Sequence, residues 1–127
     1  MTEFDTDAER PAEISQGWSE DAVLDGKVRL RQPVKGYRAG LDAALLAAAC
    51  DAAPGQRVVE AGCGVGGAML AAAFRRPGVT FSGLERDPQA AALARANIAL
   101  NGLEGRAAVI EAALPLSVAK LGLEPFD

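Results

Sequence analysis

The segment of the sequence with the clearest chemical potential is residues 60–67, which read EAGCGVGG. It follows an apolar stretch that is typical of a strand and precedes an alanine-rich stretch that is typical of a helix. In that context, glycines let the backbone turn sharply and approach a bound nucleotide closely. Gly62, Gly64 and Gly67 fit the G-x-G-x-x-G spacing of dinucleotide-binding loops. The sequence therefore predicts a loop that holds a nucleotide-like cofactor, with a turn that binds nothing as the alternative.

Two carboxylates accompany this loop. Glu85 ends the next predicted strand, where an acid is expected to receive the hydroxyl groups of a ribose. Glu60 lies two residues before the first glycine, so its charge would repel the pyrophosphate of NAD at the start of the helix. S-adenosylmethionine has no phosphate and carries a sulfonium and an ammonium. The spacing of Glu60, Gly62, Gly64 and Gly66 therefore favours S-adenosylmethionine, with an NAD-dependent oxidoreductase and a non-catalytic binding module as alternatives.

Several other chemistries are excluded by composition. The 127 residues contain no histidine, which excludes a Ser-His-Asp triad, a Cys-His pair and a His-ligated metal within this chain. Cys50 and Cys63 do not form a C-x-x-C motif, so we predict neither a zinc site nor a redox pair. We interpret Cys63 as a small buried residue and not as a nucleophile, because no base lies near it in the sequence.

The overall composition indicates a soluble globular domain. Hydrophobic residues make up 50% of the chain and charged residues 24%, which argues against disorder. No basic and apolar leader is present at the N-terminus, and no apolar stretch approaches the roughly 20 residues of a membrane span. The cysteine content fits a reducing compartment. We therefore expect a cytoplasmic protein without a membrane segment.

The elements that must position the glycine loop follow a βαβαβ alternation. Asp87-Pro88 is a typical helix start and Asn101-Gly102 a typical helix end. Such an alternation predicts a Rossmann-like, doubly wound parallel α/β sheet. We expect strands at 57–60, 79–84 and 107–110 and helices at 41–53, 67–75 and 88–100, with Leu41, Leu45, Ala48 and Ala49 on one side of the first helix.

Three regions are expected along the chain. Residues 1–17 are acidic, show no apolar period and are predicted to form a flexible tail. Residues 18–40 are predicted to form a hairpin, with a type I′ turn at Asp25-Gly26 and a basic outer face through Lys27, Arg29 and Arg31. Residues 41–127 form the predicted cofactor-binding α/β half-domain.

The basic stretch from Lys27 to Arg38 suggests a partner. It contains five cations and no acid, so it could contact the phosphates of tRNA or another RNA. A solvated hairpin face is the alternative, and the net charge of −4 gives no general support for nucleic-acid binding.

Residues 60–66 resemble motif I of class I S-adenosylmethionine-dependent methyltransferases, and residues 84–87 (LERD) resemble their motif II. Residues 31–33 (RQP) and 36–43 (GYRAGLDA) are similar to the N-terminal signature of the tRNA1(Val) adenine-N6 methyltransferase-like family. The resemblance covers roughly residues 20–127. It implies methyl transfer to an exocyclic adenine nitrogen in tRNA, while related families methylate protein glutamine or ribosomal RNA guanine.

The resemblance and the motifs together indicate a set of cofactor-binding residues. By the resemblance, Arg38, Gly40 and Asp42 would lie over the methionine end of the cofactor, and Asp42 could also cap the helix that follows. No catalytic or metal-binding residue is predicted. The predicted cofactor-binding residues are Arg38, Gly40, Asp42, Glu60, Ala61, Gly62, Cys63, Gly64, Glu85, Arg86 and Ala113.

The sequence departs from the family pattern at two places. Family members carry an acid near the end of the third strand, where this chain has Ala113, with Glu111 as the alternative. The family also has an Asn-Pro-Pro-Tyr-like motif that holds the target nitrogen, and neither Asn-Pro-Pro nor Asp-Pro-Pro occurs here. We therefore expect a piece truncated after the third strand, where a fourth strand would start at residues 126–127, and no methyl transfer by this piece alone.

The truncation has a consequence for the sheet. In the class I arrangement the first strand is central, so a three-stranded piece leaves residues 57–60 at an edge with unpaired backbone groups. We expect this edge to be covered by material outside this sequence or by self-association.

Overall fold

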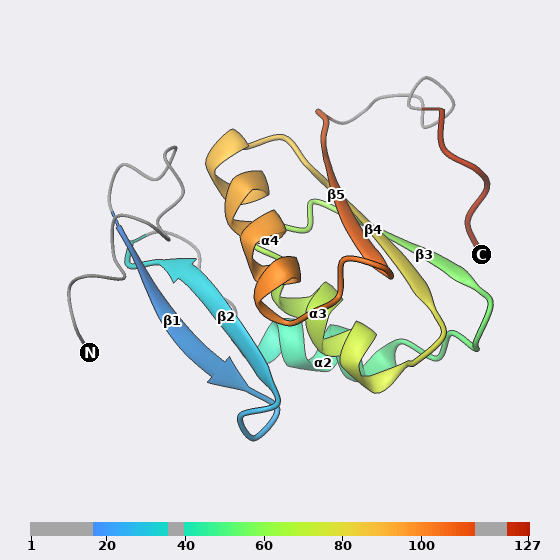
Figure 1. The fold of residues 1–127 in the computed structure, drawn as a ribbon, viewed down its shortest axis with the longest axis horizontal. Coiled ribbons are helices and arrows are strands. Elements are labelled where there is room, and N and C mark those ends of the chain that lie inside the picture. The colour runs from blue at the N-terminus through green and yellow to red at the C-terminus, as the bar shows by residue number, and fades with distance from the viewer. Residues whose placement is uncertain (1–16, 36–39, 114–121) are drawn as a thin grey trace.

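The computed structural model describes residues 17–35, 40–113 and 122–127. The predicted tail, except Gly17, and the predicted site residue Arg38 lie outside these ranges. The described chain forms three layers, a two-stranded hairpin, a group of helices and a three-stranded sheet (Figure 1). The elements are β1 (Trp18–Val23), β2 (Val28–Pro33), α2 (Leu41–Ala49), β3 (Arg57–Ala61), α3 (Gly67–Arg75), β4 (Thr80–Glu85), α4 (Pro88–Leu100) and β5 (Ala107–Glu111).

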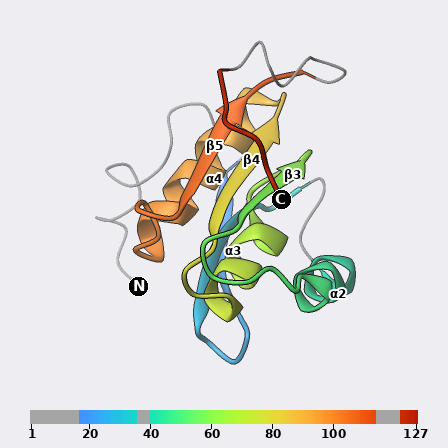
Figure 2. The same cartoon turned by 90° about the vertical axis from the view of Figure 1, so that its right-hand side faces the viewer.

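The sheet confirms the predicted α/β class. Its strands are parallel and in the order β3-β4-β5, so each strand, helix and next strand form a βαβ unit. The helices lie on one side of this sheet, and the hairpin packs on α3 and α4 from the side away from it (Figures 1 and 2). Parallel strands carry their carboxyl ends to one edge, so the segments that follow β3 and β4 meet there.

The apolar core lies between the sheet and the hairpin, within the helix layer. α3 is buried over most of its length because alanine and leucine occupy nearly every position between its ends. The hairpin contributes alternate residues of β2, Val28 and Leu30, to the same core. The largest fully buried side chains are Leu30, Leu70, Leu93, Val28, Val79 and Asn97.

α4 begins and ends as its sequence predicts. The side chain of Asp87 caps the helix by accepting a hydrogen bond from the Gln89 backbone N–H at 3.1 Å, and Pro88 follows at the first helical position. Asn101 ends the helix, and Gly102 takes a left-handed φ of 67° directly after it.

α2 differs from its prediction in length, capping and orientation. The helix ends at Ala49 and not at residue 53, because Cys50 is extended and its carbonyl accepts a hydrogen bond from the Arg76 side chain. Its N-cap is Gly40, so Asp42 is not the cap but lies in the first turn. The predicted apolar side is also wrong: Leu41 and Leu45 are exposed, and the buried residue of the helix is Ala47. 

The hairpin confirms the predicted turn. The Lys27 N–H donates to the Leu24 carbonyl at 3.1 Å, and the two residues between them, Asp25 and Gly26, have φ of 57° and 82°. Positive φ at both central positions is what a type I′ turn requires. The four residues 24–27 connect the paired ends Val23 and Val28.

The predicted basic outer face of the hairpin is wrong at Arg31. This side chain is buried, with its guanidinium 4.6 Å from the centre of the Trp18 ring and its Nε 3.3 Å from Glu20 Oε1. Arg29 remains exposed but pairs with the same carboxylate. Glu20 on the neighbouring strand thus binds both arginines. Although Arg29 and Arg31 alternate with apolar residues, only Arg29 is exposed to solvent.

The free edge of β3 is covered at its first residue by the chain itself. The Asp127 backbone N–H donates to the Arg57 carbonyl at 2.8 Å, and the Arg57 N–H donates to Asp127 Oδ2 at 2.7 Å. The Arg57 guanidinium also lies 4.6 Å from the centre of the Phe126 ring. Residues 126–127, at which the fourth strand was expected to start, thus pair with the edge at Arg57, and the covering of the rest of this edge remains a prediction.

Candidate functional site

The glycine loop joins β3 to α3 through three residues in left-handed conformations. Gly62, Gly64 and Gly66 have φ of 69°, 59° and 95°, a region that residues with a side chain rarely adopt. Gly67, the last glycine of the G-x-G-x-x-G spacing, is instead the first residue of α3. The loop conformation therefore depends on glycines at every second position, 62, 64 and 66, and not on the G-x-G-x-x-G spacing that ends at Gly67.

The loop is held against the end of β4. The backbone N–H groups of Gly62 and Cys63 both donate to the Leu84 carbonyl, at 2.7 and 3.1 Å. Cys63 then points inward and is buried beside Gly83 of β4. A Cβ on Gly83 would lie 2.5 Å from Cys63 Sγ, so only glycine fits at this position. Gly83 was not predicted as a site residue. A glycine inside a predicted strand indicates a close approach of another part of the chain, and this could have identified it.

Cys63 has the environment of a structural residue. Burial raises the pKa of its thiol to about 12, and the negative charges of Glu60 and Glu85 add to this effect. A thiol that stays protonated is a poor nucleophile.

Glu85 connects the glycine loop to the start of α4. Its Oε1 accepts a hydrogen bond from the Gly64 N–H at 2.8 Å, and its Oε2 accepts one from the Asp87 N–H at 2.9 Å. Each carboxylate oxygen has a further lone pair, so both can still accept from a ligand hydroxyl. The contact with Gly64 fixes the carboxylate directly beside the loop.

A cleft of about 570 Å³ opens at the carboxyl ends of β3 and β4. Gly62, Gly64 and Glu85 of the predicted set line it together. One wall comes from the start of α4 and another from the open end of the hairpin, which sequence reasoning did not connect with the site. The other residues that line the cleft are Gly17, Pro33, Lys35, Val65, Asp87, Gln89, Ala90 and Leu93.

Glu60 faces a different cavity. Its side chain lines an apolar space of about 260 Å³ between α2, β3 and α3. Glu60 Oε1 is buried there without a hydrogen-bond partner, and burial raises the pKa of the carboxyl to about 7. Such a group would be stabilised in its charged form by a nearby cation.

The other predicted residues lie around the cleft or away from it. Ala61 and Arg86 are exposed at the carboxyl ends of β3 and β4. Gly40 lines a third cavity of about 190 Å³ between α2 and the hairpin turn. Asp42 is exposed in the first turn of α2, and Ala113 is exposed after β5 and is not part of the cleft lining.

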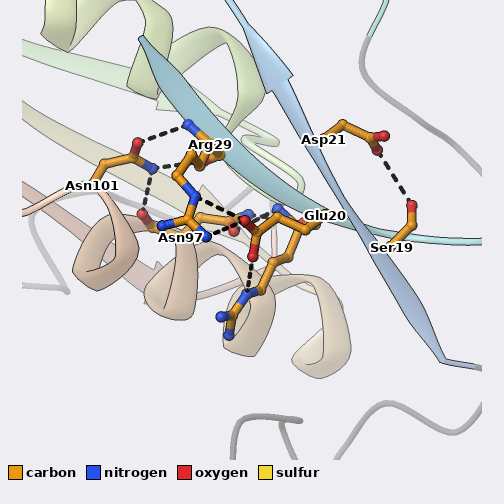
Figure 3. Close-up of polar contacts among 7 residues, drawn as sticks. Ser19, Glu20, Asp21, Arg29, Asn97 and Asn101 are labelled. Carbon is orange, nitrogen blue, oxygen red and sulfur yellow. Dashed lines mark hydrogen bonds and ion pairs between the residues drawn. The ribbon is translucent and has the colours of Figure 1, made fainter. Parts of the chain in front are cut away.

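Asn97 of α4 and Asn101, the residue that follows the helix, bind the backbone of β2, and sequence reasoning missed both contacts (Figure 3). Asn97 is completely buried and exchanges two hydrogen bonds with the backbone of Arg31, at 2.8 and 2.9 Å. Asn101 does the same with Arg29, at 2.9 and 2.7 Å. The sequence did contain an indication of these contacts: the two amides are four residues apart, and Asn97 lies on the same apolar side of the predicted helix as Leu93.

Within residues 17–35, 40–113 and 122–127, no group of three or more histidine, cysteine or acidic side chains could hold a metal ion. No helix in these ranges is long and apolar enough to cross a membrane.

Comparison with known proteins gives a family and a fold. The family described as "Methyltransferase small domain" matches residues 38–120, and no curated protein matches the chain by sequence. Two structures from Pyrococcus horikoshii, one of them TYW2 in complex with MeSAdo, have TM-scores of 0.63 at 21% and 22% identity. They match 76% of this chain, which spans 37% and 36% of theirs.

A further similar structure is a methyltransferase from Geobacter sulfurreducens in complex with S-adenosyl-L-homocysteine. It has a TM-score of 0.51 at 24% identity, over 58% of this chain and 29% of that one. At such identities the likeness to solved structures shows the fold alone.

Proposed function

The chain belongs to the methyltransferase small domain family, and from this we propose that it supplies the S-adenosylmethionine-binding part of a methyltransferase. The observation that carries the proposal is that the glycine loop and the Glu85 carboxylate line one cleft. When bound, S-adenosylmethionine supplies the methyl group from its sulfonium centre. The solved relative from Geobacter sulfurreducens, which holds S-adenosyl-L-homocysteine, supports the choice of cofactor.

The groups on the cleft wall fit the adenosine part of this cofactor. The carboxylates of Glu85 and Asp87 both line the cleft, but an acid at the position of Glu85 would also suit the ribose of NAD, so the preference for S-adenosylmethionine rests on the family match. Glu85 would accept hydrogen bonds from the two ribose hydroxyls through its remaining lone pairs. The Gly62–Gly66 backbone would lie close to the ligand because no side chain projects from the glycines.

Glu60 lines the neighbouring apolar cavity and not the cleft, so its contribution to the charge around the cofactor remains a prediction. Its buried oxygen has no protein partner, and a sulfonium or ammonium nearby would favour its ionised form. The residues predicted to lie over the methionine end, Arg38, Gly40 and Asp42, precede it along the chain. Their role remains a prediction.

For the methyl acceptor we propose the exocyclic nitrogen of adenine in tRNA. The support is the resemblance of residues 31–33 and 36–43 to the corresponding methyltransferase family. Lys27 and Lys35 are the exposed cations of the hairpin with no ion pair to Glu20, and Lys35 also lines the cleft. An RNA bound at Lys35 would therefore approach the cofactor site.

Calorimetry with two ligands tests the cofactor. We expect S-adenosyl-L-homocysteine to bind to the cleft and NAD not to bind. Binding of NAD without binding of S-adenosyl-L-homocysteine would contradict the proposal and favour an oxidoreductase. A filter-binding assay with tRNA tests the RNA-binding part of the proposal separately, and we expect Lys35→Glu to weaken that binding.

A further inference from the structure

Asn97 of α4 and Asn101 at its C-terminal end act on β2 as a neighbouring strand would. Four residues along a helix span about 6 Å, and two residues along a strand span about 6.8 Å. Asn97 and Asn101 therefore meet Arg31 and Arg29 in register, and each amide accepts from the backbone N–H and donates to the carbonyl of its partner. These are the backbone groups of β2 that point away from β1, so α4 satisfies the open edge of the hairpin.

Only Asn97 makes a further bond that reaches the glycine loop. Its Nδ2 donates to the Val65 carbonyl at 2.9 Å as well as to the Arg31 carbonyl. The corresponding bond of Asn101 goes to the Asn97 carbonyl within the same helix, at 2.8 Å. One fully buried amide thus joins α4, the hairpin and the loop, whereas its neighbour joins only α4 and the hairpin.

The three elements that Asn97 joins are the elements that form the cleft. Val65 lines the cleft directly, and Pro33, two residues after Arg31, lines it from the hairpin. Leu93, one turn before Asn97, lines it from α4. Asn97 itself is absent from the lining and is completely buried.

We propose that Asn97 is a positioning residue that sets the glycine loop and the hairpin wall at the distance required for cofactor binding. Because the Val65 contact is made by this amide and not by that of Asn101, loss of Asn97 releases the loop, whereas loss of Asn101 affects only the hairpin. The ligand part of this inference rests on the proposed function, but the position of the loop does not.

The first measurement needs no ligand. In the free protein we expect Asn97→Ala to speed hydrogen exchange at the Gly66 amide, which bonds to the Cys63 carbonyl within the loop. Asn101→Ala is the matched control: it also removes three hydrogen bonds and loosens the hairpin, but it leaves the loop contact intact. Asn97→Asp is the second variant if the alanine variant does not fold. It has the same shape, burial favours its neutral form, and that form has a single hydrogen to donate where the amide donates to both the Arg31 and the Val65 carbonyl.

The second measurement is the affinity for S-adenosyl-L-homocysteine by calorimetry, at a temperature where all variants are folded. We expect the dissociation constant to rise about tenfold in the Asn97 variants and less than about twofold in Asn101→Ala. Equal effects of the Asn97 and Asn101 variants on exchange and affinity would overturn the inference. If the unaltered protein does not bind this ligand, the proposed function fails, and the exchange measurement still decides the role of Asn97.

Discussion

Replacing Gly83 by alanine tests whether the packing between β4 and the glycine loop determines the shape of the site. The added methyl group would lie 2.5 Å from Cys63 Sγ and 2.9 Å from Cys63 Cβ. Rotation of the thiol could relieve the first contact. The second involves Cβ, which moves only with the backbone of the loop.

The expected magnitude follows from the chemistry of overpacking. An extra methyl group in a closely packed interior costs about 1–3 kcal/mol, because neighbours must leave their preferred positions. Met69 Sδ, at 3.3 Å from the same point, closes the space on another side. We expect the free energy of unfolding to fall within this range. Affinity for S-adenosyl-L-homocysteine should fall as well, since Cys63 belongs to the loop between Gly62 and Gly64.

Urea unfolding and calorimetry measure the two effects. Gly105→Ala is the control, because its added Cβ meets nothing within 4 Å and its φ is not left-handed; its stability should stay equal or rise slightly. Adding Cys63→Ala to Gly83→Ala removes the closest contact and should recover part of the loss. Gly83→Ala with unchanged stability and affinity would refute the close packing described for this site.

Three further outcomes are expected. Glu85→Ala should weaken S-adenosyl-L-homocysteine binding by about 2 kcal/mol, since it leaves the Gly64 N–H and the ligand hydroxyls without an acceptor; a calorimetric change within error would remove Glu85 from the site. Gly64→Val should abolish that binding, because valine disfavours the φ of 59° that the loop requires. The domain should still melt cooperatively, because an added Cβ meets nothing within 4 Å; retained binding would show that the loop is only a turn. Glu60 has a pKa raised from 4.5 to about 7 by burial, so its protonated form favours folding and stability should fall as pH rises through this range. Urea unfolding of Glu60→Gln across the same pH range should lack this fall, and equal pH profiles would contradict the burial of the charge.

The parts of the fold that were predicted correctly have local causes. The turn at Asp25-Gly26, the cap at Asp87-Pro88 and the glycine loop each depend on residues adjacent in sequence. The meeting of Gly64 and Glu85 was also predictable, because parallel strands place their carboxyl ends at one edge. These features required only conformational preferences and a known topology.

The parts that were missed depend on distant partners. Residues 50–53 favour a helix, but the Cys50 carbonyl binds Arg76 and the Ala53 N–H binds Gln56, and α2 ends early. Arg31 is buried because Glu20 and Trp18 lie across the hairpin. Asn97 was missed because its partners, Arg31 and Val65, are identified only when the hairpin packs on α4.

The hairpin has a partner that is made late during synthesis. The bond between Arg31 and Asn97 joins residues 66 positions apart. A ribosome adds about 5–20 residues per second, so roughly 3–13 s separate their appearance, while a hairpin forms within microseconds. A nascent chain therefore presents β2 with an open edge for seconds, and an open edge pairs with other strands. The outward backbone groups of Arg29 and Arg31 therefore gain their partners only after α4 has been made.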